Sequence, residues 1–451
     1  MTFLSLAFAR GRGATGRLVR AAALVAALSI PFGSPRTVAA EPTLTLAEAQ
    51  RLAVGRSRQL AGQDLAADAA RHMAVAAGQL PDPVARIGVD NLPVNGPEAF
   101  TVGRDFMTMR RIGIAQEFTR GEKRRLRAER FEDDALVALA EKDAAIANIQ
   151  RDVALAWIDR YYAEAMQAVI AEQAREIELE IQAAQSAYRG GRGSQADVFA
   201  AHSAQVALED RASEFGRRVR AAKATLARWI GTSAADGPLG LRPATDAIRL
   251  DLAALDQHLA HHPQILVLAA QEQVAATEAR LAQANRQSDW SVELAYQQRG
   301  PAYSNMVSIG VSIPLQWDRA NRQDRELAAK VAMAEQAKAA REEALRAHIG
   351  QVQAMLVEWQ NGRERLARYE RDLVPLARER TRAAVAAYAG GKASLPDLLA
   401  ARRNEIDVRM QAVQLEMDTA RTWAQLNFLF PSDVSSAQPQ LGVVGSIKDL
   451  R

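Results

Sequence analysis

Two long stretches of the chain carry apolar residues at three- and four-residue spacing, the period of a helix that buries one face. The first runs from about residue 123 to 188 and the second from about 322 to 388, and Pro375 is the only proline in either. The pattern is clearest at Ile149, Val153 and Trp157 and at Val352, Leu356 and Trp359. At 1.5 Å per residue, each helix would reach roughly 100 Å. The pattern therefore predicts two helices far longer than those of an ordinary globular domain.

Shorter segments ahead of each long helix alternate apolar and polar residues with the period of a β-strand. They cover residues 85–90 and 112–114 in the first half and residues 292–297 and 307–313 in the second. Proline and glycine separate the members of each pair, which predicts β-hairpins at about 84–118 and about 290–317. The alternation slips at Arg110-Arg111, which predicts a β-bulge. An ordinary sheet packed on helices is the alternative to a membrane-facing one.

A motif at the end of the first long helix returns 200 residues later, at the end of the second. The shared residues are Tyr188, Gly190, Gly191, Ser194 and Asp197 in one copy and Tyr388, Gly390, Gly391, Ser394 and Asp397 in the other. The glycines can adopt the left-handed conformation that ends a helix, and the Ser-x-x-Asp element can cap the next helix. Each copy therefore predicts the tip of a helical hairpin, at about 188–197 and about 388–397. The long offset indicates a duplicated half rather than a short repeat.

Each half thus predicts the order helix, β-hairpin, long helix, glycine tip, helix. The first structural repeat covers residues 41–240, the second covers 241–434, and residues 435–451 form a flexible tail. The fold class is mainly α with a small β part. Four strands per chain are too few to close a barrel around a lumen, so an apolar outer face would have to be completed by other copies.

The N-terminus predicts a signal peptide over residues 1–40. Arginines precede a short apolar run, and Val38-Ala39-Ala40 offers small residues for cleavage before Glu41. Its removal takes away five arginines and no acid, so the net charge of +4 becomes −1. That charge excludes a nucleic-acid partner recognised through a basic surface. The chain has no cysteine, so its stability rests on packing rather than disulfides.

No catalytic or cofactor motif occurs in the sequence, so neither an enzyme nor a cofactor is expected. His258, His261 and His262 form one histidine cluster, but His262-Pro263 is more typical of a helix start than of a metal site. The sulfur atoms of Met73, Met107 and Met109 would suit Cu(I). Met107 and Met109, however, are expected to share one strand face that contacts lipid or the core. No metal site is predicted.

With this layout the chain resembles the TolC family of outer-membrane efflux proteins over nearly the whole mature sequence. The specific marks are the doubled tip motif, the junction Gln116-Glu117-Phe118-x-x-Gly121-x-Lys123-Arg124, and its counterpart Ser312-Ile313-Pro314-Leu315. The segment Gly78-Gln79-Leu80-Pro81-Asp82-Pro83 and the first junction are most similar to the heavy-metal-efflux branch, of the Czc and Cus type.

The resemblance implies a homotrimer in the outer membrane of a Gram-negative bacterium. Twelve strands would form one barrel in outer-membrane lipid, and twelve helices would form a periplasmic tunnel. It also implies docking to a periplasmic membrane-fusion adaptor and an inner-membrane resistance-nodulation-division pump. The expected function is passive conduction of heavy-metal cations to the exterior. A channel for drug efflux or type I protein secretion is one alternative, and a soluble periplasmic coiled-coil adaptor or scaffold is another.

The same resemblance assigns roles at the tips. Tyr188, Asp197, Tyr388 and Asp397 fall on the periplasmic gate, and Asp397 matches a constriction-ring aspartate. A second acid follows one turn later in the family, where this sequence has Ala400. Both aspartates can equally act as helix caps, and the two roles are compatible. The turn residues expected to contact the adaptor are Gly190, Gly191, Arg192, Ser194, Gly390, Gly391, Lys392 and Ser394. The copies differ in sequence, which favours the second as the gate.

Overall fold

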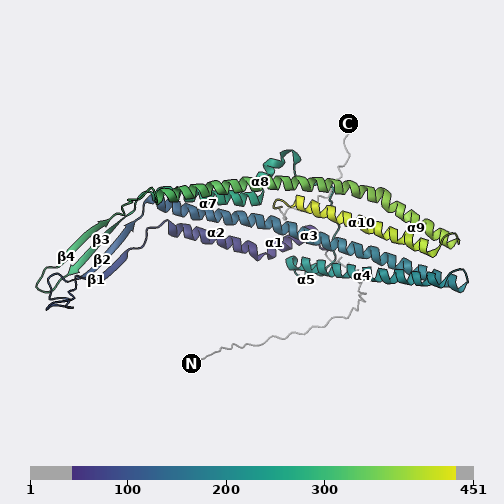
Figure 1. Cartoon of the computed structure of the whole chain (residues 1–451), viewed down its shortest axis with the longest axis horizontal. Helices are drawn as coiled ribbons and strands as arrows, with labels where there is room; N and C mark the ends of the chain where they lie inside the picture. Colours follow the sequence, from purple (N-terminus) through teal and green to yellow (C-terminus); the bar gives the residue numbers. More distant parts are fainter. Residues whose placement is uncertain (1–42, 433–451) are drawn as a thin grey trace, which may run out of the picture. The chain divides into compact units, whose positions relative to one another are not determined.

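The computed structural model describes residues 43–432, so the expected signal peptide and tail lie outside the described residues. The first half contains α1 (Leu46–Arg56), α2 (Arg58–Ala77), β1 (Val84–Asp90), β2 (Met109–Phe118), α3 (Gly121–Arg189), α4 (Gln195–Ile230) and α5 (Thr232–Asp236). The second contains the short helices η1 (Leu252–Ala254) and α6 (Leu255–Ala260), then α7 (Pro263–Asn285), β3 (Trp290–Gln298), β4 (Met306–Ser312), α8 (Gln323–Arg368), η2 (Tyr369–Leu373), α9 (Val374–Ala389) and α10 (Leu395–Asn427). Figure 1 shows this order along the chain. The expected fold class, mainly helical with a small antiparallel sheet, is confirmed.

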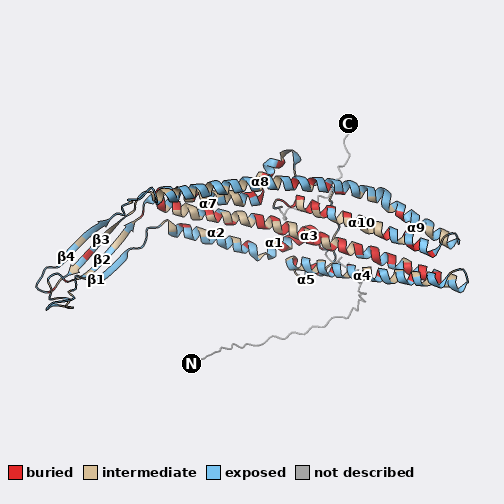
Figure 2. Cartoon of the chain, viewed as in Figure 1, coloured by how far each residue is buried: buried red, intermediate tan, exposed pale blue. Residues whose placement is uncertain are grey.

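Helix α3 is the element on which most of the others pack. Its 69 residues contain no proline and many alanines, so nothing in its sequence ends the helix before the glycine tip. It contacts α2 and α7 along one part of its length and α4 and α10 along another (Figure 1). Its buried residues form an almost continuous stripe in Figure 2. No helix within residues 43–432 combines the length and the apolar content needed to cross a membrane.

The second long helix runs over the predicted range of about 322–388, but it is not regular throughout. A π-helical segment, η2, separates α8 from α9. Pro375, in the first turn of α9, explains it. Proline lacks a backbone N–H and its ring crowds the carbonyl four residues earlier, here that of Arg371. The wider π turn accommodates this defect without breaking the helix axis.

Three tryptophans anchor the largest apolar core, which joins α1, α3, α8 and α10. Trp157 is fully buried, and its indole Nε1–H donates to the backbone oxygen of Leu44 at 3.0 Å. The indole of Trp359 donates to the backbone oxygen of Thr245 at 3.1 Å, and that of Trp423 to Ala247 at 2.7 Å. Each indole therefore fixes a segment that has no helical hydrogen bonds of its own. This satisfies the polar end of each buried ring.

The four strands form one antiparallel sheet in the order β1-β2-β3-β4. Residues Met109–Ala115 pair one for one with β1, so the predicted bulge at Arg110-Arg111 is absent from this register. The two arginines instead alternate like any neighbouring strand residues. Arg111 points to the polar face, where it forms ion pairs with Asp90 and Glu293, and Arg110 points to the other face. A polar residue on each face, and no insertion, explains the slip in the hydrophobic pattern.

One face of the sheet is apolar and uncovered. From the strand pairing, the residues on this face are Ile87, Ile112, Ile114, Val292, Leu294, Tyr296, Val307, Ile309 and Val311. Ile87 is 82 % exposed and Ile309 is 75 % exposed. The opposite face carries small and polar residues such as Gly113, Ser308 and Gly310. Within residues 43–432, no strand pairs with the outer edge of β1 or β4. A sheet with this surface would be unstable in water by itself, because exposed apolar area is costly and bare strand edges associate.

The crossing of α8 over α10 predicts opposite effects for two glycines of α8. A Cβ added at Gly362 would lie 2.5 Å from Thr419 Oγ1, whose hydroxyl is held by the Leu415 carbonyl at 2.7 Å. At Gly350 a Cβ would meet nothing within 4 Å. We expect Gly362→Ala to lower the free energy of unfolding by about 1–3 kcal/mol through overpacking. Gly350→Ala should raise it by up to about 1 kcal/mol through helix propensity. Thermal unfolding followed by circular dichroism measures both, and equal stabilisation would contradict the close crossing.

Candidate functional site

The two hairpin tips share one backbone geometry, which requires a glycine at the same place in both copies. In the first tip, Gly191 has a φ of 70°, and the amide of Arg192 donates to the Ala187 carbonyl at 2.9 Å. In the second, Gly391 has a φ of 68°, and the amide of Lys392 donates to the Ala387 carbonyl at 2.8 Å. A positive φ is strained for any residue with a side chain. The second glycine of each pair is therefore the one that the turn requires.

Both aspartates of the motif are helix caps. The Asp197 amide donates to Ser194 Oγ at 3.1 Å, and the Ser194 amide donates to Asp197 Oδ2 at 2.9 Å. Ser394 and Asp397 repeat these bonds at 3.3 and 3.2 Å, so the capping boxes read from the sequence are confirmed. Hydrogen bonds from the Ser394 side chain and backbone lower the pKa of the Asp397 carboxyl. Asp397 is therefore negatively charged at neutral pH and is exposed at the tip.

The tips differ in what their other residues contact. The Tyr188 side chain is 49 % exposed, whereas Tyr388 packs on the apolar cluster between the hairpins. Burial raises the pKa of Tyr388, and the charges of Asp197 and Glu180 raise it further. Tyr388 of the second tip thus lies in the electrostatic field of the first. Of the residues predicted at the gate, Tyr388 is therefore influenced by the charge of Asp197, whereas Tyr188 is exposed to solvent.

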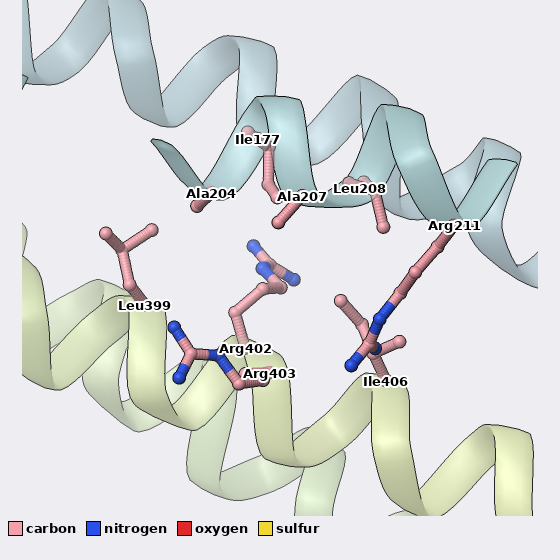
Figure 3. A pocket seen from close by; sticks show the side chains of 9 residues that line it. All are labelled: Ile177, Ala204, Ala207, Leu208, Arg211, Leu399, Arg402, Arg403 and Ile406. Atoms are coloured by element: carbon pink, nitrogen blue, oxygen red, sulfur yellow. The ribbon is translucent and has the colours of Figure 1, made fainter. Parts of the chain in front are cut away.

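The two hairpins are joined by an apolar cluster from α3, α4 and α10. Its buried members are Met166, Ile170, Ile177, Ile181, Ala184, Ala201, Leu208, Phe215, Leu395, Leu398, Leu399 and Ile406. A cleft of about 80 Å³ opens between α4 and α10 beside this cluster. Figure 3 shows its apolar floor, with Arg211, Arg402 and Arg403 around the rim. The start of α10 is therefore held against the first hairpin rather than standing free.

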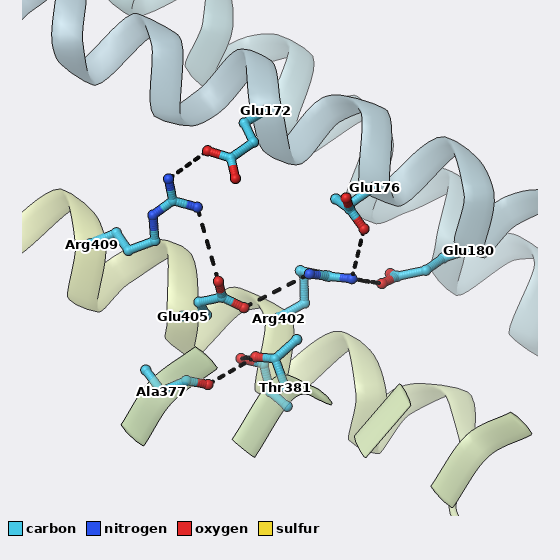
Figure 4. A network of polar contacts seen from close by, with 9 residues as sticks. Glu172, Glu176, Glu180, Ala377, Thr381, Arg402, Glu405 and Arg409 are labelled. Carbon is cyan, nitrogen blue, oxygen red and sulfur yellow. Dashed lines mark hydrogen bonds and ion pairs between the residues drawn. The ribbon is translucent and has the colours of Figure 1, made fainter. Parts of the chain in front are cut away.

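An ion network crosses the same interface, on the side drawn in Figure 4. Arg402 of α10 lies 2.9 Å from Glu180 and 3.4 Å from Glu176, both on α3. Arg409, two turns further along α10, lies 2.5 Å from Glu172. Glu405 lies between the two arginines, at 3.8 Å from Arg402 and 3.9 Å from Arg409. The network therefore fixes the register of α10 along α3.

The carboxylates of this network differ in burial and in the direction of their pKa shifts. Burial raises the pKa of the Glu180 carboxyl, and the charge and hydrogen bond of Arg402 oppose this shift in part. Glu172 is more exposed, and its hydrogen bond with Arg409 lowers its pKa. The Glu180 side chain therefore depends on Arg402 most of all. Removal of one partner from such a pair leaves a buried charge uncompensated.

Comparisons with known proteins agree with this architecture. Residues 254–430 match the sequence profile described as Outer membrane efflux protein. The fold resembles that of the outer-membrane channel OprN, with a TM-score of 0.73 at 17 % identity over 86 % of this chain and 90 % of OprN. For CusC the TM-score is 0.72 at 15 % identity, over 86 % of this chain and 92 % of CusC. For VceC from Vibrio cholerae the TM-score is 0.69 at 18 % identity, over 85 % of this chain and 95 % of VceC. At these identities the likeness establishes the fold. Among curated proteins, none matches this sequence.

The resemblance to TolC-type efflux proteins, inferred from the tips and strand junctions, is thereby confirmed. The family match lies in the second half of the chain. The three solved structures share the fold of both halves.

Sequence reasoning missed the ion network between α3 and α10. Arg402 and Glu180 are 222 residues apart, and both stand among many other charged helix residues. One signal was available, since Arg402, Glu405 and Arg409 follow the tip motif at helical spacing and share one face of α10. The acidic partners Glu176 and Glu180 show the same spacing on α3. Nothing in the sequence alone pairs these two faces.

The histidines and methionines singled out in the sequence lie in different surroundings. Within the described part of the chain, no three His, Cys, Asp or Glu side chains gather closely enough to hold a metal ion. His262 caps α7 with Pro263 in the first turn, as the sequence predicted, while His258 and His261 are exposed. The expectation that Met107 and Met109 share a strand face is wrong. β2 begins at Met109, because Asp105 Oδ2 accepts from the Met107 amide at 3.1 Å and holds that residue in a turn.

We expect Arg402→Gln to loosen the second helical hairpin. The change leaves Glu180 buried without its cation, which costs about 3 kcal/mol. Arg403→Gln is the matched control, because Arg403 is the exposed neighbour on the cleft rim. Differential scanning calorimetry should show a lower Tm for the first variant and little change for the second. If both variants have the Tm of the wild type, the network does not stabilise the interface.

Proposed function

We propose that this protein is the outer-membrane channel of a tripartite efflux system and acts as a homotrimer. The observation that carries the proposal is the sheet, whose apolar face is uncovered and whose two edges are unpaired. Both deficits disappear if three copies join edge to edge, since twelve strands can close with the apolar face toward lipid. The small and polar face, with Arg86, Arg111 and Glu293, would then line the lumen.

The helices support the periplasmic part of this proposal. Helix α3 starts three residues after β2 and extends for roughly 100 Å to its tip. In a trimer these helices would surround a tunnel, with six tips at its far end. Arg192 and Lys392 are exposed at the tips, where a periplasmic membrane-fusion adaptor would dock. An inner-membrane resistance-nodulation-division pump would supply the cargo through that adaptor. This arrangement favours a membrane channel over a soluble coiled-coil adaptor.

The proposed cargo is heavy-metal cations, conducted passively. The support is the sequence likeness of residues 78–83 and of the first strand junction to the heavy-metal branch. A ring of three Asp397 carboxylates would concentrate negative potential at the entrance and attract cations. Weak, distributed attraction suits conduction, because a tight metal site would hold its ion. Drug efflux and protein secretion are the alternatives for cargo.

We further propose that the second tip is the gate and that the first supports it from outside. Leu395 and Leu398 bury the start of α10 against the first hairpin, whereas Phe199 of α4 is 63 % exposed. Asp397 is exposed and Asp197 is half-buried. The charge available to a pore therefore lies on the second copy.

A single lysine on the apolar face should prevent assembly. We expect Ile309→Lys to abolish heat-modifiable trimers in the outer-membrane fraction, since a charge facing lipid costs about 2–4 kcal/mol in each copy. Cells carrying it should also lose tolerance to divalent metal cations. Ser308→Lys, one residue away on the polar face, is the control and should assemble. If both variants form trimers, the apolar face of the sheet does not contact lipid. If Ile309→Lys cells lose tolerance to drugs but not to metal cations, the cargo is drugs rather than metals.

Neutralising the second tip should change the pore, while the same change in the first should not. Asparagine keeps a capping oxygen and removes the charge, so Asp397→Asn and Asp197→Asn form a matched pair. We expect Asp397→Asn to lower the cation selectivity and raise the leakage of single channels in a planar bilayer, because the negative ring is lost. Equal currents from both variants and the wild type would leave Asp397 with a capping role only.

A further inference from the structure

His262 and His348 meet at a junction of four segments, far from the tips in sequence. His262 precedes α7, and His348 lies in the middle of α8. Their ring centroids are 4.1 Å apart, with 47° between the ring planes. They line a cavity of about 440 Å³ together with residues of α3 and of the segment that follows α10. The pair therefore lies where both halves of the chain are joined.

The His262 ring holds two of these segments together. Its Nδ1 accepts a hydrogen bond from the Gln264 amide at 3.3 Å, which caps the first turn of α7. The ring also hydrogen-bonds the backbone of Leu429, just after α10. Phe430 packs edge-on against it, with 5.7 Å between ring centroids. Because Nδ1 uses its lone pair in the cap, His262 can fill this role only in its neutral form.

The other charged groups around the pair do not favour its protonation. From α3 the cavity is lined by Arg151 and Asp152, which pair with each other at 2.8 Å. α8 contributes His348 itself, whose Nε2 is buried with no hydrogen-bond partner, and the lining residues after α10 are uncharged. Burial lowers the pKa of His262 to about 4, with further lowering by His348 and Arg151, while the hydrogen bond with the Leu429 backbone acts in the opposite direction. Burial also lowers the pKa of His348.

We propose that His262 and His348 form a proton-operated clasp between α7, α8 and the end of α10. A proton taken up at Nδ1 of His262 occupies the lone pair that caps α7, so the Gln264 bond is lost. The new charge lies against the second imidazole and near Arg151, which pushes the two rings apart. The displaced His262 ring then loses its edge-on packing on Phe430, which loosens the segment after α10, while the bond between the ring and the Leu429 backbone remains.

A second attachment limits how far the segment after α10 can move. The Ser432 amide donates to Gln150 Oε1 at 2.9 Å, and Gln150 Nε2 donates to the Ser432 carbonyl at 2.8 Å. Neither group titrates, so this attachment to α3 persists in acid. The clasp therefore opens only locally, and Ser432 stays attached to α3.

The direction of the pH effect follows from the lowered pKa. Between pH 6.5, the ordinary histidine value, and about 4, an opened His262 binds a proton that the closed form does not. The closed form is therefore fully favoured above that range and loses its advantage as the pH falls through it. For one proton, the opening equilibrium constant rises by up to about tenfold per pH unit within this range.

Hydrogen exchange of the full-length protein tests the clasp. Peptides covering residues 263–267 and 428–432 are compared between pH 7 and 4.5, after correction for the intrinsic pH dependence of exchange. In the wild type their opening should increase as the pH falls, by up to about tenfold per unit. His262→Asn keeps a capping oxygen and cannot titrate, so its opening should stay constant. His258→Asn, an exposed histidine nearby, should behave like the wild type.

A second variant covers the case in which His262→Asn does not fold. His348→Gln removes the neighbouring imidazole and should weaken the pH dependence at the same two peptides. Identical pH dependence in the wild type and in either junction variant would overturn the proposal.

Discussion

The structure depends on one constraint, which is that three buried indole rings must each find a hydrogen-bond acceptor. Trp157, Trp359 and Trp423 donate to Leu44, Thr245 and Ala247, all in segments outside the helices. These bonds hold the segment before α1 and the connection between the two halves against the middle of the helices. The sheet lies beyond one end of the helices packed on this core, and the tips lie beyond the other. Neither has a comparable core of its own.

The chain carries two copies of the tip motif, and the structure packs them unequally. The tip turns share their backbone geometry almost atom for atom. Their surroundings differ, because α10 is packed between α3 and α9 whereas α4 leaves Phe199 exposed. Arg402 and Arg409 have no counterpart that acts in the same way from α4. A repeated sequence thus fixes a local conformation, while the packing around it decides which copy is restrained.

Much of the fold could be read from the sequence because its signals are local. The helical period over residues 123–188, the alternation of the strands and the Gly-Gly and Ser-x-x-Asp elements each act within a few residues. The interruption at η2 was missed, although Pro375 was visible, because a proline can be tolerated by several helix distortions. The supposed bulge failed for a related reason. Arg110-Arg111 breaks the hydrophobic alternation, but an arginine can occupy either face of a strand.

The site itself was only half accessible to sequence reasoning. Its capping residues follow from a motif, so their bonds were predicted correctly. The contacts between Arg402 and Glu180, and between His262 and His348, join residues far apart in sequence. Their pairing depends on the rotation of each helix about its axis. That rotation is set by the whole packed core, and no local pattern encodes it.

The junction between sheet and helices has a mechanical consequence. Lys123 is almost fully buried, and its Nζ lies 2.6 Å from the Gln287 carbonyl and 2.8 Å from Asp289 Oδ2. The Arg120 amide donates to the other oxygen of Asp289 at 3.0 Å. Helix α3 is thus clamped at its first turn to the other half of the chain and behaves as a rod fixed at one end. We therefore expect a movement of the tip to be taken up mainly by gentle bending along the 69 residues of α3.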